Sequence, residues 1–515
     1  MTIDINSSLM APSSTILVNN SNSLEIFDQT PQAQSFNSSK TSESRVFHRS
    51  LHSDPLHVVG AKGHYLTLSN GQEIFDASGG AAVACLGHGD VRIQDALMEQ
   101  MNQVSYCHSL FYATHAAEDL AKLLIDSTDG EMARAFFISS GSEAMEAALK
   151  LARQYHLEKA SPEPSRVHFI SRHQSYHGTT LGALAAGGHV ARRAIFEPIL
   201  SINTSRVSPC YAYRAVHDLT EANETMYIRK LEAELDLEFQ RVGSENVAAF
   251  IAEPVVGAAL GCVPPSPGYF KAVRKVCDKH GALLIFDEVM SGTGRVGPET
   301  SEKYRKPLHA WQDPLIGVVP DIMTMGKGLG GGYMPIAAML ANRRVVNALC
   351  NGTGAFSHGQ TYQGHPLACR AALQVQRIIR DSDSVANVRE QGAVMSRLLH
   401  KRLDDHPFVG NIRGRGLFWG IEFVKSKDTK EPFAQSVGIA MGIHELGMQR
   451  PYNISLYPGT GCADGKSGDH IILAPAYNIT ADEISQVVDT TVTVIERFFS
   501  EMEVERDADD SNGHK

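Results

Sequence analysis

The chain has 515 residues, of which 43% are hydrophobic and 20% are charged, so we expect at least two packed lobes. A net charge of −10 without a basic stripe argues against a nucleic-acid-binding protein. No apolar run is long enough to span a bilayer, which argues against a membrane protein. The eight cysteines are scattered, without a close Cys-x-x-Cys pair, and this favours reduced thiols in the cytoplasm over disulfides or a zinc site.

Both ends of the chain are polar. Residues 1–45 are rich in Ser, Asn, Thr and Gln, which predicts a disordered tail. Up to Ser44 this stretch has a single Lys, no Arg and several acidic residues, so it fits neither a mitochondrial transit peptide nor a secretory signal. Residues 500–515 are acidic and predict a second disordered tail. These features favour a cytoplasmic protein with its folded part between the two tails.

Short apolar runs alternate with helical patterns through the first part of this folded region. Helices are expected over 142–157 and 267–280, and strands over 133–138, 166–170, 247–252, 282–286 and 321–325. Strands separated by helices predict an α/β fold with a largely parallel sheet covered on both faces. Each strand ends in polar or Gly-rich residues. Because such sheets bind ligands at the carboxyl ends of their strands, we expect these residues to converge on one site.

A second, smaller α/β lobe is predicted after residue 365. Its expected elements are helices over 366–381 and 384–403 and a strand over 417–424. A hairpin is expected over 65–74, with its turn at Asn70-Gly71. We therefore divide the folded chain into a segment over 46–100 that packs with the small domain, a large domain over 101–365 and a small domain over 366–499.

The run from Ser139 to Glu143 follows an expected strand and opens a helix. Backbone N–H groups at a helix N-terminus, with Gly141 allowing close approach and Ser142 adding a hydroxyl, form a suitable seat for a phosphate group. The alternative is an ordinary serine helix cap without a ligand. The local sequence leaves both interpretations open.

Asp287 and Lys327 each follow a buried strand. An aspartate at the end of an apolar strand needs a partner, which can be a pyridinium N–H, a Lys or Arg side chain, or a metal shared with Glu288. Lys327 lies between glycines, where burial and a nearby cation would lower its pKa and leave a neutral amine that attacks aldehydes. The alternative is a solvated lysine in a flexible turn. The glycines around it do not fit a dinucleotide fingerprint or a phosphate-binding Walker loop.

Three further features are individually weak. Tyr176 offers an aromatic face for a planar ring, although such residues more often serve packing. Thr361 supplies a hydroxyl near the start of a helix. Arg415, between two glycines, suits a bidentate carboxylate contact but equally suits a surface turn. His358 and His365 lack a convincing third ligand, so we predict no metal site.

The order and spacing of these motifs are far more specific than any one of them. Together they closely resemble the class III aminotransferases over nearly the whole chain from about Val58, in the runs Gly141-Ser-Glu-Ala, Tyr176-His-Gly, Glu253-Pro, Asp287-Glu-Val, Gly326-Lys-Gly and Gly414-Arg-Gly. This resemblance implies pyridoxal 5′-phosphate (PLP) as cofactor. It also implies PLP fold type I, with a large domain built on a mostly parallel seven-stranded sheet and a smaller α/β domain.

The resemblance also implies a role for each residue. Lys327 would form the Schiff base with PLP and move the proton during catalysis, and Asp287 would pair with the ring nitrogen. The rest of the cofactor would be held by Gly141 and Ser142 at the phosphate, Tyr176 and Val289 at the ring, and Thr361 from the neighbouring subunit. Arg415 would receive the substrate carboxylate and Tyr112 would line the substrate pocket, with packing as the alternative for Tyr112. A shared site implies a homodimer or a larger oligomer.

Departures from the ornithine- and GABA-type members narrow the expected substrates. At the positions of Ala258, Met290 and His365, the ornithine- and GABA-type members carry Glu, Gln and Asn. The residues of this chain are similar to those of the amine:pyruvate and ω-amino acid:pyruvate branch. Ala81 stands where dialkylglycine decarboxylases place Gln, which disfavours decarboxylation. We therefore expect a transaminase that moves an amino group from an amine or ω-amino acid to a keto acid such as pyruvate. The alternatives are a racemase or aminomutase on the same scaffold, or a non-catalytic PLP-fold binding protein.

Overall fold

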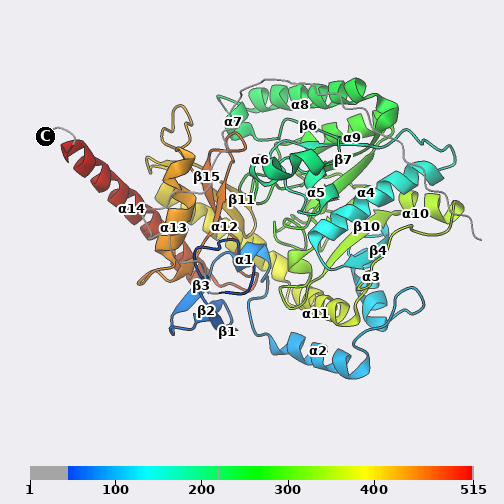
Figure 1. The fold of residues 1–515 in the computed structure, drawn as a ribbon, viewed down its shortest axis with the longest axis horizontal. Coiled ribbons are helices and arrows are strands. Elements are labelled where there is room, and N and C mark those ends of the chain that lie inside the picture. Colours follow the sequence, from blue (N-terminus) through cyan, green and yellow to red (C-terminus); the bar gives the residue numbers. More distant parts are fainter. Residues whose placement is uncertain (1–43, 219, 513–515) are drawn as a thin grey trace, which may run out of the picture.

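The computed structural model describes residues 44–218 and 220–512, with side chains described up to Glu503. Nearly all of the predicted N-terminal tail therefore lies outside the described residues. The described part forms a large α/β lobe and a smaller lobe (Figure 1). No helix in this part of the chain is long and apolar enough to cross a membrane.

The large lobe is built on a seven-stranded sheet with the order β4-β10-β9-β8-β7-β5-β6. Strand β10 runs antiparallel to β4 and β9, and the other neighbouring strands are parallel. This confirms the predicted fold class. The strands are β4 (Met132–Ile138), β5 (His168–Arg172), β6 (Thr204–Val207), β7 (Val247–Ala252), β8 (Leu283–Asp287), β9 (Ile322–Met325) and β10 (Ala337–Asn342).

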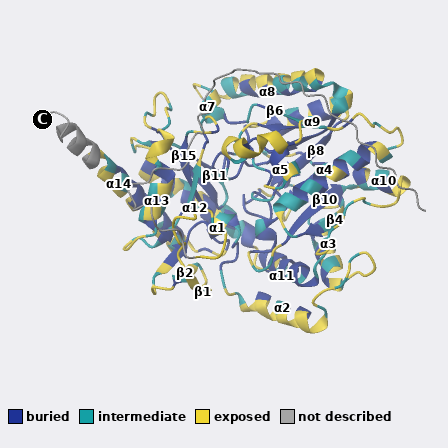
Figure 2. Ribbon diagram, viewed as in Figure 1, coloured by how far each residue is buried: buried dark blue, intermediate teal, exposed yellow. Residues whose placement is uncertain are grey.

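Helices cover both faces of this sheet, so its central strands are apolar along their whole length. Alternate residues of a strand point to opposite faces. Phe250 and Phe286 pack towards α8 (Glu221–Val242) and α9 (Tyr269–His280). Ile251 and Ile285 pack on the other side, in a cluster with residues of α4 (Gly141–Glu158), α5 (Leu181–Ala186) and α10 (Arg343–Asn351). Figure 2 shows the resulting pattern, a buried sheet beneath helices that expose their outer faces.

The small lobe contains a sheet with the order β11-β12-β15-β14. Its strands are β11 (Val409–Arg415), β12 (Phe418–Phe423), β14 (Tyr457–Thr460) and β15 (Asp469–Leu473). Its helices include α11 (Pro366–Asp381), α12 (Ser384–Leu403) and α13 (Ile439–Gly447). Two further helices, α2 (Val91–Gln103) and α3 (His115–Asp126), pack against α11.

The predicted N-terminal hairpin is present. Strands β2 (Tyr65–Leu68) and β3 (Glu73–Asp76) pair antiparallel, and β1 (Val58–Lys62) pairs with β2. Strand β3 also pairs in parallel with β13 (Ile454–Ser455), a strand that follows α13. This pairing joins the N-terminal segment to the C-terminal part of the chain.

The C-terminal end differs from the sequence-based prediction. The chain forms one helix, α14 (Ala481–Asn512), whose C-terminal end extends away from the body of the molecule (Figure 1). The prediction of a disordered tail from residue 500 is therefore wrong as far as Asn512. The acidic composition suggested a solvated coil. However, glutamate, alanine and arginine are good helix formers, and no Gly or Pro interrupts the run.

Candidate active site

A cavity of about 500 Å³ lies at the carboxyl edge of the large sheet, where the loops after β4, β5, β7, β8 and β9 meet. Strands that are distant in the sequence thus bring their end residues to one place, as expected for a parallel sheet. The residues that these loops and the start of α4 contribute to the lining are Ser139, Ser140, Gly141, Ser142, Tyr176, His177, Gly178, Glu253, Ala258, Asp287, Val289, Met290, Lys327, Gly332, Met334, Pro335 and Ile336.

The start of α4 forms one end of this cavity. Ser140 caps the helix by accepting a hydrogen bond from the Glu143 N–H, so the helix-cap interpretation holds for Ser140. Two glycines beside this helix start, Gly141 and Gly178, are tightly enclosed. A Cβ atom on Gly141 would lie 2.8 Å from Val289 Cγ1, and one on Gly178, where φ is 135°, would lie 2.6 Å from Ser142 Oγ. Only glycine fits at 141 and 178. Gly141 and Ser142 line the cavity, and their first-turn N–H groups have no intrahelical acceptor, which suits an anion.

Asp287 is 5% exposed and is held in a fixed orientation. Its Oδ2 lies 2.8 Å from His177 Nδ1, and its Oδ1 accepts hydrogen bonds from the Val289 N–H at 3.1 Å and the Thr324 hydroxyl at 3.3 Å. Among the described residues, its ion-pair partner is a histidine and not the Lys or Arg considered above. His177 Nε2 is buried without a partner in the same set. A carboxylate fixed in this way is suited to hold a proton on a ring nitrogen.

The neighbouring Glu288 is bound by backbone donors of another segment. It accepts hydrogen bonds from the Ala310 and Trp311 N–H groups at 2.8 Å, and burial raises its pKa to about 8. Within residues 44–218 and 220–512, no group of three or more His, Cys, Asp or Glu side chains is arranged to hold a metal ion.

Lys327 has the properties of a nucleophilic amine. Burial lowers its pKa to about 8, although Asp287 and Glu253 act in the opposite direction. Its Nζ donates a hydrogen bond to the Ala81 carbonyl at 2.8 Å. Its backbone has φ of 46°, a left-handed conformation that is strained for a side-chain-bearing residue and is often found at functional sites. With a pKa of about 8, roughly a tenth of this amine is neutral at pH 7.

Tyr176 and Val289 both line the cavity. Burial raises the pKa of the Tyr176 hydroxyl, and the Arg192 guanidinium lies 4.7 Å from the centre of its ring. The Tyr176 N–H donates to Glu253 at 3.3 Å, which fixes the loop after β5 to the loop after β7. An aromatic ring and a branched aliphatic side chain provide apolar surfaces for a flat ligand.

Three residues predicted from the sequence lie elsewhere. Of the described residues that line the cavity, none is Arg415, Tyr112 or Thr361. Arg415 pairs with buried Asp313 at 2.6 Å. Tyr112 is 66% exposed and lines a separate cavity beside α3. Thr361, which was assigned to the site of a neighbouring subunit, is exposed, and its carbonyl accepts a hydrogen bond from the Tyr106 hydroxyl.

Other cavity residues were given no role in the sequence analysis, namely Arg49, His177, Arg192, Glu253 and Tyr457. A usable signal existed for His177 and Glu253, because a buried aspartate needs donors and Glu253 itself follows an apolar strand. Glu253 accepts hydrogen bonds from the Tyr176 and Gly257 N–H groups. The other three belong to distant segments, and no local pattern marks them.

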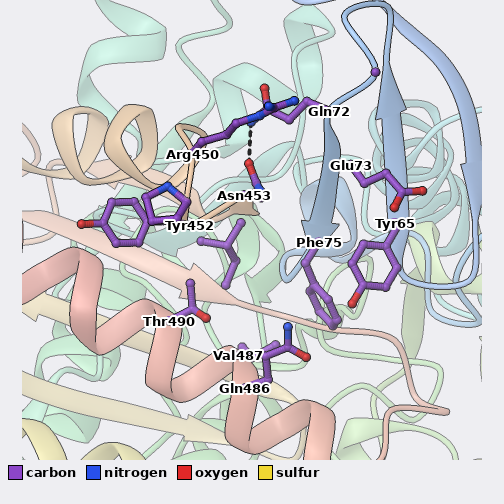
Figure 3. Close-up of a pocket in the computed structure, with 13 residues that line it drawn as sticks. Tyr65, Gln72, Glu73, Phe75, Arg450, Tyr452, Asn453, Gln486, Val487 and Thr490 are labelled. Atoms are coloured by element: carbon purple, nitrogen blue, oxygen red, sulfur yellow. Dashed lines mark hydrogen bonds between the residues drawn. The ribbon is translucent and has the colours of Figure 1, made fainter.

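A second cavity, of about 400 Å³, lies between the N-terminal hairpin and α14 (Figure 3). It contains Tyr65, Phe75 and Tyr452, and the Gln72 amide donates to Asn453 Oδ1 at 2.7 Å. Its charged residues, Glu73 and Arg450, are both exposed. Its lining has neither a buried lysine nor a buried carboxylate, so we place the chemistry in the first cavity.

The residues of the first cavity fit PLP. A partly neutral lysine suits its aldehyde, a fixed carboxylate suits its ring nitrogen, and the start of α4, where Gly141 and Ser142 line the cavity, suits its phosphate. The fold and this site together define a PLP-dependent enzyme.

Comparisons with known proteins give the family. Residues 47–495 match the family model described as aminotransferase class-III. A protein named aminotransferase from Gibberella zeae is 52% identical over 439 residues, covering 85% of this chain and 83% of that protein. The chain belongs to the class III aminotransferases, and these enzymes use PLP.

Solved structures agree with this assignment. An amine transaminase from an uncultivated Pseudomonas species, in its PLP-bound form, is 31% identical with a TM-score of 0.79, covering 90% of this chain and 100% of that one. An (S)-enantioselective omega-transaminase from Thermomicrobium roseum is 32% identical with a TM-score of 0.78, covering 86% of this chain and 93% of that one.

Proposed function

We propose that this aminotransferase moves an amino group from an amine or ω-amino acid to a keto acid such as pyruvate, with Lys327 carrying the cofactor. The observation that supports the proposal best is the position of the Lys327 amine. It lies in a cavity shared with Asp287 and the start of α4, and burial holds its pKa at about 8. Such an amine can condense with an aldehyde at neutral pH.

Each residue then has a defined task. Bound PLP supplies an aldehyde that takes up the amino group and a ring that accepts electrons. Lys327 Nζ would hold the cofactor and would then move the proton at the substrate carbon. Asp287, oriented by His177, would keep a proton on the ring nitrogen. Gly141 and Ser142 would hold the phosphate, and Tyr176 and Val289 would lie against the ring.

The substrate class is supported by the lining of the cavity and by the similar structures. Ala258 and Met290 both line the cavity. The cavity therefore lacks, at these two positions, the carboxylate and the amide that ornithine- and GABA-type members are expected to carry. Of the two solved structures described above, one is an amine transaminase and the other an omega-transaminase. We extend the proposal to a cytoplasmic homodimer in which Thr361 completes the partner's site.

The experiment is a screen of amine and ω-amino acid donors with pyruvate, read as alanine formed by the PLP-loaded protein. We expect alanine from at least one primary amine or ω-amino acid. Omitting pyruvate separates the alternatives, because a racemase or aminomutase turns over without an external keto acid. Conversion of a single amino acid at full rate without pyruvate would therefore replace the transaminase proposal.

A further inference from the structure

A further cavity, of about 420 Å³, lies between the segment 300–308, which follows β8, and the turn that joins α11 to α12. Residues at the end of α3 complete its wall. Its fully buried lining residues are all apolar, namely Pro307, Leu308, Ile379 and Val385. It shares no lining residue with the cavity at the sheet edge, so it is separate from the site that fits PLP.

The lining of this cavity is rich in cations, although the chain as a whole has a net charge of −10. It contains five cationic and three acidic side chains, namely Lys303, Arg305, Lys306, Arg380, Arg389, Asp126, Asp129 and Asp383. Two of these are paired with residues outside the lining, Lys303 with Glu131 at 2.5 Å and Asp126 with Lys122 at 2.8 Å. In the part of the chain that the structure describes, the other four cations have no carboxylate within ion-pair distance. Four cations against two acids leave an excess of positive charge that a ligand can neutralise.

Arg389 is the most firmly held of the four unpaired cations. It is half-buried in α12, and its Nη1 donates a hydrogen bond to the Pro298 carbonyl at 2.9 Å. Its alkyl chain packs against Gly297, where an added Cβ would lie 3.0 Å from Arg389 Cγ. A guanidinium that is already fixed in a cavity wall loses little freedom on binding, and its remaining N–H groups match the oxygens of a phosphate.

The start of α12 adds to this positive charge. Its first residues follow Asp383, which has φ of 48° and whose side chain makes no capping hydrogen bond. Val385, in the first turn, lines the cavity. Because the first-turn N–H groups of a 20-residue helix carry a partial positive charge, they favour an anion beside the four cations.

We propose that this cavity binds a small polyanion with two linked phosphate groups. Several cations and a helix start suit a ligand with more than one negative charge, and the volume lies within the range of about 300 to 1,000 Å³ that is usual for small-molecule sites. The shared chemistry is the diphosphate group, which inorganic pyrophosphate and nucleoside diphosphates both supply. In a nucleotide, the organic part would contact the apolar residues Leu308, Ile379 and Val385. The inference does not depend on the proposed transaminase function.

The first test is calorimetry of the PLP-loaded protein with inorganic pyrophosphate at low ionic strength. We expect one binding event per chain, with a dissociation constant that rises about 10-fold or more in Arg380→Gln/Arg389→Gln. The matched control is Arg229→Gln/Lys230→Gln, which removes two cations from the exposed face of α8 and should change the constant by less than about 2-fold. Equal losses in both variants would reflect overall charge and overturn the proposal.

A second variant, Arg305→Gln/Lys306→Gln, separates lost binding from disturbed folding, because Arg389 also contacts Pro298. Both of its side chains are exposed, so the melting temperature should equal that of wild type. We expect the dissociation constant for pyrophosphate to rise about 3- to 10-fold, a smaller change because solvent screens exposed charges. Unchanged binding in this variant and in Arg380→Gln/Arg389→Gln would overturn the proposal.

Three further ligands define the chemistry and the source of the diphosphate. Tighter binding of ADP than of pyrophosphate would identify a nucleotide as the natural ligand, and equal binding would identify pyrophosphate, whereas adenosine alone should not bind. Succinate, with two charges but no phosphate, should bind at least about 10-fold more weakly, and equal binding would overturn the assignment to phosphates. The absorbance of bound PLP should stay unchanged throughout. Its loss on adding pyrophosphate would place the anion at the start of α4 and overturn the proposal, as would absence of binding by both pyrophosphate and ADP.

Discussion

Two of the cavities among the described residues, at the sheet edge and beside α14, are similar in size, about 500 and 400 Å³, but they differ in how their charged groups are held. In the cavity at the sheet edge, Asp287 and Glu253 are each 5% exposed and held by hydrogen bonds, and Lys327 has a lowered pKa. In the cavity beside α14, Glu73 and Arg450 are exposed (Figure 3).

The difference shows that volume does not identify a catalytic site. Burying a charged group is energetically unfavourable because the group loses its hydration. Buried charged groups with shifted pKa values are therefore often found where they serve chemistry. Topology explains why they gather at the sheet edge, since parallel strands deliver their end residues to one place. The cavity beside α14 lies between separately placed elements, and no set of parallel strand ends meets there.

The largest effect on activity is expected for Lys327→Ala. We expect loss of the visible absorbance of bound PLP and a fall in turnover to background, because no other lysine lines the cavity among the described residues. Absorption spectra and alanine formation measure both effects. The melting temperature should stay within a few degrees of wild type, which separates lost chemistry from lost folding. A variant that kept full turnover would refute the assignment of Lys327.

The next largest effect is expected for Asp287→Asn. The amide keeps the shape of the side chain but cannot hold a proton on the ring nitrogen, so we expect kcat to fall roughly 100-fold or more. Steady-state kinetics with the best donor measure this. The absorbance of bound PLP should persist, in contrast to Lys327→Ala. Unchanged kcat would show that the buried carboxylate has only a structural role.

Much of this cavity could be predicted from the sequence, because its signals are local. An apolar strand followed at once by Asp287, and another followed by Gly326 and Lys327, mark strand ends, and strand ends of one parallel sheet meet. The placement of Arg415 could not be predicted, since its partner Asp313 lies in a distant loop. The same applies to Arg192, because no local pattern marks its position in the cavity over the Tyr176 ring.

A smaller effect concerns pH. Burial lowers the pKa of Lys327 to about 8 from an ordinary value of 10.5. The neutral, reactive amine is therefore a minor form at pH 7 and the major form at pH 9. We expect the rate at which cofactor-free protein captures added PLP to rise about 10-fold between these values, with a midpoint near 8. Stopped-flow absorbance measures this rate. A midpoint near 10.5 would contradict the effect of burial on Lys327.

The smallest effect is expected in the second cavity. Arg450→Gln removes an exposed charge that has no ion-pair partner among residues whose side chains are described, so kcat/KM for any donor should change by less than about 2-fold. The matched measurement is Arg192→Gln with the same donors. Because both variants remove one guanidinium from a cavity wall, their difference isolates the effect of location. A loss in Arg450→Gln as large as that in Arg192→Gln would connect the cavity beside α14 to catalysis and remove the contrast between the two cavities.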